Sequence, residues 1–229
     1  MNYLTHKGVK RHRFYIAFQG IVLLLLFVLF EITAFANPKI YLIRHAEVNL
    51  KKPGWETSKK SEEYKEAYKF AGTEPFNPVE VLQKIKRYET LDTVFCSPLP
   101  RALETALTLF DGNAVLQTDF ALVELDYPVV QVPLLQFPVK GWLFISRIAW
   151  MAGINSGEKA GYKERLEELN NFSDELIKFA YRNGLAVVVA HGMVNRELVK
   201  LLKESGWQFC ENGKDGYGNL SVNCLEYHN

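Results

Sequence analysis

Three short apolar runs, residues 39–43, 93–96 and 186–190, recur along the chain, and each ends abruptly in polar residues. They are rich in strand-forming side chains and are too short to be independent helices. A segment with apolar residues at helical spacing follows the second and the third run. Because strands that alternate with helices form parallel sheets covered on both faces, the pattern predicts an α/β fold. We expect a three-layer α/β/α sandwich with a mostly parallel central sheet.

Helices are expected to surround this sheet. They are predicted over residues 58–70, from Pro78 onward, from Pro100 onward, and over residues 162–181 and 194–205. Asn77 before Pro78 is typical of a helix start, since Asn caps free backbone N–H groups and Pro fits the first turn. The polar stretch 51–73 is interpreted as a surface insertion, and residues 220–227 are expected to add an edge or antiparallel strand.

The first 36 residues have the pattern of an export signal. Basic residues come first, an unbroken apolar run follows at 21–30, and Ala34-Phe35-Ala36 forms a small-x-small cleavage site. The competing interpretation is an uncleaved membrane anchor, since residues 14–30 approach the ~17 to 25 residues of a membrane helix. We therefore expect residues 1–36 to be a signal peptide or an anchor, and residues 37–229 to be one exported domain. Either way the domain lies outside the cytoplasm, in a periplasmic or other extracytoplasmic compartment.

The charge balance argues against nucleic acid as a partner. The chain has 27 basic and 26 acidic residues, of which the first 36 residues hold four basic residues and one acidic residue. Residues 37–229 therefore carry 23 basic and 25 acidic side chains. A nucleic-acid-binding protein usually has a strong basic excess, which this domain lacks.

The three cysteines suggest one disulfide at most. Cys96 lies in an apolar run and is expected in the core. An oxidising compartment permits a bond between Cys210 and Cys224, and the glycines and asparagines between them supply turn residues. Two unpaired, half-buried thiols fit the sequence equally well.

Histidines and arginines follow the predicted strands. Residues 37–229 contain three histidines, of which His45 and His191 come directly after apolar runs, while Arg44 and Arg101 lie close to strand ends. Ligand sites in α/β sheets lie at the carboxyl ends of the strands. A single histidine of this kind is more often an ordinary core or surface residue, but two of them at strand ends, each in a strand-to-helix turn, indicate a functional site.

Together these segments resemble the signature motifs of the histidine phosphatase superfamily, the phosphoglycerate-mutase-like group. The motifs are Leu42-Ile43-Arg44-His45-Ala46-Glu47, Ser97-Pro98-Leu99-Pro100-Arg101-Ala102 and Val188-Val189-Ala190-His191-Gly192. The resemblance implies a phosphoglycerate-mutase-like fold and a nucleophilic His45 that carries the phosphoryl group. It further implies that Arg44, Arg101 and His191 bind the phosphate, that His191 also serves catalysis, and that no metal or other cofactor takes part. Ala46 stands where the family usually has glycine, which weakens any inference about the substrate.

The residue chemistry agrees with these implied roles. Charge spreads over the equatorial oxygens of a transferring phosphoryl group, and the planar fork of arginine offers paired hydrogen bonds to them. His45 must attack as a neutral imidazole, so an acceptor has to hold the proton of one ring nitrogen and expose the lone pair of the other. The sequence does not identify that acceptor.

The resemblance also implies an acid that protonates the leaving group. The family often draws it from a glutamate between the second and third motifs, which makes Glu124 the expected acid and Glu158 the alternative. The competing interpretation for either residue is a surface carboxylate in a salt bridge.

The apolar segment 142–152 leaves two interpretations open. It is either a core helix or a lid or membrane-facing helix, and an apolar lid would favour a lipid-linked or amphiphilic phosphate. The expected partner is therefore a phosphorylated small molecule or a lipid-linked phosphate. Membrane contact is expected through the N-terminal segment or through residues 142–152.

We expect an exported phosphomonoesterase that works through a phosphohistidine intermediate on His45. The alternatives are a catalytically silent phosphate-binding surface module and phosphoryl transfer of the phosphoglycerate-mutase type. Retention of both histidines and both arginines argues against the silent module, since binding alone does not require a nucleophile. Export argues against the mutase, which needs a cytosolic pool of phosphoglycerate.

Overall fold

The computed structural model describes residue 19 and residues 37–154 and 160–228. The chain divides into two units, residues 1–37 and 38–229, and the strands and helices below belong to the second. Apart from Gln19, the expected signal or anchor segment lies outside the described residues, as does Glu158. No helix within the described ranges has the length and hydropathy needed to cross a lipid bilayer.

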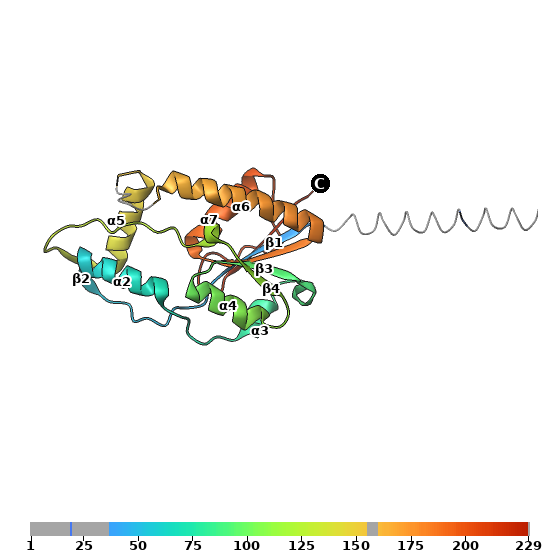
Figure 1. Cartoon of the computed structure of the whole chain (residues 1–229), viewed down its shortest axis with the longest axis horizontal. Coiled ribbons are helices and arrows are strands. Elements are labelled where there is room, and N and C mark those ends of the chain that lie inside the picture. Colours follow the sequence, from blue (N-terminus) through green and yellow to red (C-terminus); the bar gives the residue numbers. More distant parts are fainter. Residues whose placement is uncertain (1–18, 20–36, 155–159, 229) are drawn as a thin grey trace, which may run out of the picture. The chain divides into compact units, whose positions relative to one another are not determined.

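A six-stranded sheet in the order β4-β3-β6-β1-β8-β7 forms the centre of the domain (Figure 1). Its strands are β1 (Lys39–Arg44), β3 (Thr93–Cys96), β4 (Val115–Thr118), β6 (Leu185–Ala190), β7 (Gln208–Phe209) and β8 (Val222–Glu226). The first four of these run parallel to one another, whereas β8 runs antiparallel to both β1 and β7. The three predicted strands are the adjacent β3, β6 and β1, and the C-terminal strand is antiparallel but interior.

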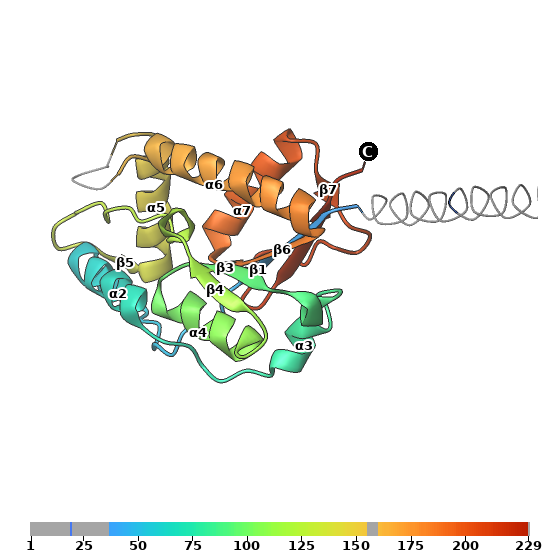
Figure 2. The ribbon, with the colours of Figure 1, turned by 45° about the vertical axis from the view of Figure 1, so that its right-hand side comes forward.

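Both faces of the sheet are covered by helices (Figure 2). Along β1, Ile40 and Leu42 pack toward α6 (Tyr162–Asn183) and α7 (Gly192–Glu204). Tyr41 and Ile43 alternate with them and pack toward α3 (Pro78–Leu82) and α4 (Pro100–Phe110). Successive side chains of a strand point to opposite faces, so one apolar run supplies two cores. The predicted three-layer α/β/α sandwich is confirmed.

The helix predicted from Pro78 is much shorter than its pattern suggested. Asn77 caps it, accepting a hydrogen bond from the Val79 backbone at 3.1 Å, but the helix ends at Leu82. Ile85 is still buried against the sheet, while Arg87 adopts a left-handed conformation before the short 3-10 helix η1 (Tyr88–Thr90). The pattern of buried apolar residues therefore continues to Ile85, past Leu82, where the helix ends.

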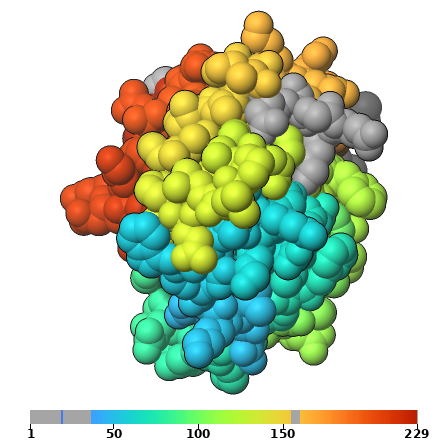
Figure 3. Space-filling model, turned by 90° about the vertical axis from the view of Figure 1, so that its left-hand side faces the viewer, coloured from blue at the N-terminus to red at the C-terminus, as the bar shows by residue number. Residues whose placement is uncertain are grey.

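Two segments far apart in sequence form a cap at one end of the domain. We use "cap" for residues 55–70 and 136–151, which contain β2 (Trp55–Thr57), α2 (Ser58–Phe70), β5 (Gln136–Pro138) and α5 (Val139–Met151). β2 and β5 pair antiparallel, and the indole Nε1 of Trp142 donates to the Glu56 carbonyl at 2.9 Å. Figure 3 faces this end, where α2 (cyan) adjoins the segment through α5 (yellow). The predicted insertion is thus one half of a two-part element.

Cys210 and Cys224 form a disulfide across the β7–β8 hairpin. This settles the alternative that the sequence left open. Cys96 is free and fully buried in β3, as expected.

Candidate active site

The parallel pairing of β1 and β6 brings the two strand-end histidines together. Arg44 and Ala190 are partners in the register, so His45 and His191 both follow at the same edge of the sheet. The backbone N–H of His45 donates to the Ala190 carbonyl at 3.0 Å, and the two imidazole centroids lie 5.1 Å apart. Both side chains are almost completely buried.

The imidazole of His45 has a different partner at each ring nitrogen. Nδ1 lies 2.7 Å from the carbonyl oxygen of Ala46, to which it can only donate, and Nε2 accepts from Nε of Arg101 at 3.3 Å. Burial first, and then the charges of Arg101 and Arg44, lower the pKa of His45 from 6.5 to about 3, although the Ala46 contact opposes this. The acceptor missing from the sequence argument is thus the Ala46 carbonyl, and Nε2 of this neutral ring carries the lone pair.

Arg101 lies in the first turn of α4 and is held by the cap. It is 2% exposed, and its Nη1 donates to the carbonyls of Tyr68 and Lys69 at 3.3 and 3.2 Å. The guanidinium also stacks over the Tyr68 ring, 5.0 Å from its centroid. The C-terminal end of α2 therefore orients the arginine against His45.

Arg44 is fixed by a segment near the C-terminus. Its Nη1 donates to the carbonyl of Tyr217 at 2.6 Å. Arg44 and Tyr217 line a cavity of about 150 Å³ together with Glu124, Arg147 and Arg196. Three guanidinium groups therefore surround this cavity, which suits an anionic ligand.

Glu124 follows the short helix η2 (Phe120–Leu122) and faces the same arginines. Burial raises the pKa of its carboxyl group, while the charges of Arg101, Arg147 and Arg44 act in the opposite direction. Its Oε1 is buried and has no hydrogen-bond partner within the described parts of the chain. Glu124 and Arg101 also line a second cavity of about 130 Å³, whose other walls include Leu143. A buried carboxyl group with a raised pKa, beside a cavity that arginines line, can serve as a general acid.

His191 is the N-cap of α7 and shares a hydrogen bond of 2.9 Å between its Nε2 and Oγ of Ser97. Burial first, and then the charges of Arg101, His45 and Arg44, lower the pKa of His191 well below its ordinary value. The ring is therefore neutral at pH 7. Its buried Nδ1 has no hydrogen-bond partner among the residues that the structure describes, so this nitrogen is available to a ligand.

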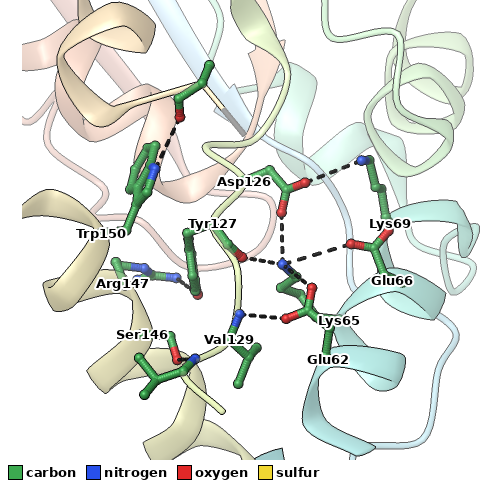
Figure 4. A network of polar contacts seen from close by, with 12 residues as sticks. Glu62, Lys65, Glu66, Lys69, Asp126, Tyr127, Val129, Ser146, Arg147 and Trp150 are labelled. Carbon is green, nitrogen blue, oxygen red and sulfur yellow. Dashed lines mark hydrogen bonds and ion pairs between the residues drawn. The ribbon is translucent and has the colours of Figure 1, made fainter. Parts of the chain in front are cut away.

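A polar network joins the segment after Glu124 to the cap (Figure 4). Nζ of Lys65 in α2 lies 3.0 Å from Asp126 and 2.9 Å from Glu62, and it also donates to the Tyr127 carbonyl. From the other side, Nη2 of Arg147 in α5 donates to the hydroxyl of Tyr127 at 3.3 Å. Both cap helices thus hold the segment that carries the candidate acid.

The structure gathers five of the six residues proposed from the sequence, namely Arg44, His45, Arg101, Glu124 and His191. Glu158 lies outside the described residues. The apolar segment 142–152 falls in α5 as far as Met151. Neither interpretation describes it alone, because Trp142, Ser146 and Trp150 are buried whereas Phe144, Ile145 and Ile148 are exposed.

Sequence reasoning missed Arg147 and Tyr217. The signal for Arg147 was weak but present: it is the only charged residue between positions 141 and 157. Tyr217 contributes through a backbone carbonyl, which every residue has, so no residue type could have revealed it.

Comparisons with known proteins identify the family and the fold. The histidine phosphatase superfamily (branch 1) model matches residues 79–229, which include Arg101, Glu124 and His191. Solved structures with this fold include the mycobacterial glucosyl-3-phosphoglycerate phosphatase Rv2419c (15% identity, covering 84% of this chain and 91% of that chain, TM-score 0.52). A mutant phosphoserine phosphatase from Entamoeba histolytica in complex with phosphoserine is similar at 19% identity (81% and 89% covered, TM-score 0.50). A third is the product of the open reading frame Rv3214 from Mycobacterium tuberculosis (14% identity, 82% and 90% covered, TM-score 0.51).

No curated protein matched the sequence. The family match nevertheless spans about two thirds of the chain, from α3 to the C-terminus. The fold of the solved phosphatases extends the likeness over more than four fifths of the chain. The protein therefore belongs to the histidine phosphatase superfamily.

Proposed function

We propose that this protein hydrolyses phosphate monoesters through a phosphohistidine formed on Nε2 of His45. The observation that carries the proposal is the tautomer of His45, whose Nδ1 faces the Ala46 carbonyl while Nε2 faces the arginine side of the site. A lowered pKa keeps this imidazole neutral, and therefore nucleophilic, throughout the physiological range.

In the first step the Nε2 lone pair of His45 forms a bond to phosphorus and the bond from phosphorus to the ester oxygen breaks. Glu124 gives its proton to the departing oxygen, which leaves as an alcohol. In the second step a water molecule attacks phosphorus, Glu124 takes a proton from that water, and the N–P bond breaks. Inorganic phosphate leaves, and His45 and Glu124 return to their starting protonation states.

Arg44, Arg101 and His191 are assigned to the phosphate oxygens. The two guanidinium groups offer fixed positive donors to the charge that develops during transfer. If Ser97 donates its hydroxyl proton to Nε2 of His191, the proton of that ring lies on Nδ1, the nitrogen available to a ligand. His191 then adds a neutral hydrogen bond to the same phosphate.

The substrate is proposed to be amphiphilic or lipid-linked. Leu143 of α5 lines the cavity that also contains Arg101 and Glu124, and the next residue, Phe144, is 62% exposed on the outside of the cap. Ile148, one helical turn further, is 51% exposed. An apolar group on the substrate, or a lipid surface, would cover this outer face of α5.

Export of the domain is part of the same proposal. It is supported by the basic start, apolar run and Ala34-Phe35-Ala36 of the sequence and by the Cys210–Cys224 disulfide, a bond typical of oxidising compartments. Mass spectrometry of protein from its native type of host should find a chain that begins at Asn37. An intact chain in the membrane fraction would show that the N-terminal segment is not cleaved and acts as a membrane anchor.

The test of activity is hydrolysis of p-nitrophenyl phosphate by the full-length protein in the presence of a metal chelator. We expect turnover that the chelator does not reduce, and a phosphoryl group on His45 that acid-free quenching and mass spectrometry can trap. Absence of hydrolysis with retained phosphate binding would favour a silent binding module. Phosphoryl transfer to a second phosphoglycerate in place of water would favour a mutase.

A further inference from the structure

We propose that the loop closed by the Cys210–Cys224 disulfide positions the nucleophile, with Asn219 as the positioning residue, and that full activity requires this disulfide. We call residues 211–223 the disulfide loop. The inference rests on the proposed function for its activity readout only, because the position of His45 can be measured without turnover.

The loop contacts Arg44 at three points. The backbone N–H of Arg44 donates to the Ser221 carbonyl at 3.1 Å, and the Leu220 N–H donates to the Arg44 carbonyl at 3.2 Å. The guanidinium of Arg44 donates to the Tyr217 carbonyl at 2.6 Å. Both the backbone and the charged group of Arg44 are therefore oriented by the same short stretch of chain.

Asn219 of this loop acts on His45 through the backbone. Its Nδ2 donates to the His45 carbonyl at 3.1 Å and to the Ala46 carbonyl at 2.9 Å. The Ala46 carbonyl is also the acceptor for Nδ1 of His45 at 2.7 Å. The amide of Asn219 thus fixes the peptide oxygen that selects the nucleophilic tautomer, and Thr105 holds the other side of that residue by accepting from the Ala46 N–H at 2.9 Å.

The exposure of Asn219 supports this assignment. Asn219 is exposed, and its amide Nδ2 donates to two backbone carbonyls, those of His45 and Ala46. These two hydrogen bonds join its side chain to the strand end that carries the nucleophile. The amide can hold them only while the loop keeps its position.

The disulfide fixes the base of the loop. The Cys210 N–H donates to the Cys224 carbonyl at 2.9 Å, and Gly213 bonds to both cysteine residues, donating to the Cys210 carbonyl and accepting from the Cys224 N–H at 2.8 Å each. The bonded cysteines are 14 residues apart, so the bond removes much of the conformational freedom of the loop. A dithiol reductant supplies two electrons and two protons, converts the cystine to two thiols and becomes a disulfide itself.

A site completed by a cystine has a consequence for where the protein works. In a reducing compartment the loop would be closed only by hydrogen bonds, and the nucleophile would be less well held. In an oxidising compartment the bond forms and the site is completed. The activity would then rise after export, which is the direction that the N-terminal sequence suggests.

The first test compares full-length wild type with the Cys210→Ala/Cys224→Ala double variant, each with and without a dithiol. We expect the dithiol to lower kcat of the wild type about tenfold, the size of one lost net hydrogen bond at the site. The double variant should start at this lower kcat and not respond to the dithiol, since the remaining Cys96 is unpaired. An unchanged kcat in a wild type whose cystine is shown to be reduced would overturn the redox requirement.

The second test keeps the disulfide and changes Asn219. Asn219→Ala should lower kcat about tenfold with a smaller change in KM, whereas Glu211→Gln, an exposed change on the same loop, should leave both constants unchanged. Nitrogen NMR of His45 should show a proton on Nδ1 in wild type and in Glu211→Gln, and a mixture of tautomers in Asn219→Ala and after reduction. The same tautomer in all four samples would overturn the positioning role. If the wild type does not hydrolyse phosphate esters, the proposed function is wrong, but the NMR comparison still tests the positioning role of Asn219.

Discussion

Nε of Arg101 donates to Nε2 of His45 across 3.3 Å, so the arginine contacts the nitrogen that is proposed to attack phosphorus. A phosphorus atom must approach the same lone pair. The Nε–H of Arg101 therefore has to exchange its acceptor, from Nε2 of His45 to a phosphate oxygen, as the N–P bond forms. The carbonyls of Tyr68 and Lys69 remain as partners for Nη1 and keep the guanidinium in place during the change.

This geometry predicts that Arg101→Lys cannot replace arginine. An ammonium group is a single point of charge and cannot contact His45, the α2 carbonyls and a phosphate together. We expect kcat/KM for p-nitrophenyl phosphate to fall about 10²- to 10³-fold, as for other preorganised donors to developing charge. The measurement is steady-state kinetics with Arg182→Lys, an exposed position on α6, as the matched control. A loss below about fivefold would show that Arg101 does not contact the transferring group.

The centre of this site could be predicted because buried parallel strands leave a clear mark in sequence. β1, β3 and β6 are nearly continuous apolar runs, and the bounds of β3 and α2 agree with those predicted. Once the strands are parallel and adjacent, residues just past their ends must lie together. Arg44, His45, Arg101 and His191 were found for this reason.

The surroundings of the site could not be predicted, because they depend on pairing between distant segments. β2 and β5 are three residues each and are separated by 78 positions, too short to show a period. Tyr217 and the carbonyls of Tyr68 and Lys69 act through the backbone, which has no residue type. α5 buries one face on the domain and exposes another, so neither a core helix nor a lid describes it.

The rate should not fall at acid pH in the way that protonation of an ordinary nucleophilic histidine would cause. His45 has a pKa of about 3, so it stays neutral at pH 5, where a histidine of pKa 6.5 would lose about 30-fold in its neutral form. Burial raises the pKa of Glu124, so its carboxyl group stays protonated to a higher pH than that of an ordinary glutamate. The protonated form, which gives its proton to the leaving group, is lost as the pH rises further.

We therefore expect kcat/KM to change little between pH 7 and pH 5 once the ionisation of the substrate is divided out, and to fall on the alkaline side. The measurement is a pH profile with an alkyl phosphate for wild type and Glu124→Gln. Glu124→Gln should have a lower kcat/KM than the wild type, and its kcat/KM should not fall at alkaline pH, because the variant has no carboxyl proton to lose. A midpoint near 6.5 on the acid side would contradict the lowered pKa of His45.

The exposed face of α5 should matter for amphiphilic substrates only. Replacing Phe144 and Ile148 with Ser removes apolar surface that is already in contact with solvent, so folding should change little. We expect the rate on a long-chain alkyl phosphate in lipid vesicles to fall, and the rate on p-nitrophenyl phosphate to stay the same. The control is Phe120→Ser, which removes a 79% exposed aromatic ring outside the cap. Equal effects of the two changes on the vesicle substrate would count against α5 as the contact surface.

The nucleophile and the acid can be separated by the leaving group. His45→Ala removes the atom that bonds to phosphorus, so hydrolysis of every substrate should be lost together, whatever alcohol is released. Glu124→Gln leaves His45 and the phosphate-binding arginines in place but cannot give a proton to the departing oxygen. General acid catalysis typically contributes ~10² to 10⁴ in rate, and this loss should appear where the alkoxide leaves poorly.

Alkyl phosphates should therefore suffer most from Glu124→Gln, whereas p-nitrophenyl phosphate, which releases a stable anion, should suffer little. Rates of both substrate types on both variants give the comparison, with Glu104→Gln as the control. That carboxylate accepts from the Thr73 backbone at 2.7 Å and lines neither cavity of the site. Equal losses on the two substrates with Glu124→Gln would show that Glu124 is not the acid. Glu158, the alternative from the sequence, should then be changed to Gln and should give the dependence on leaving group that Glu124 failed to give.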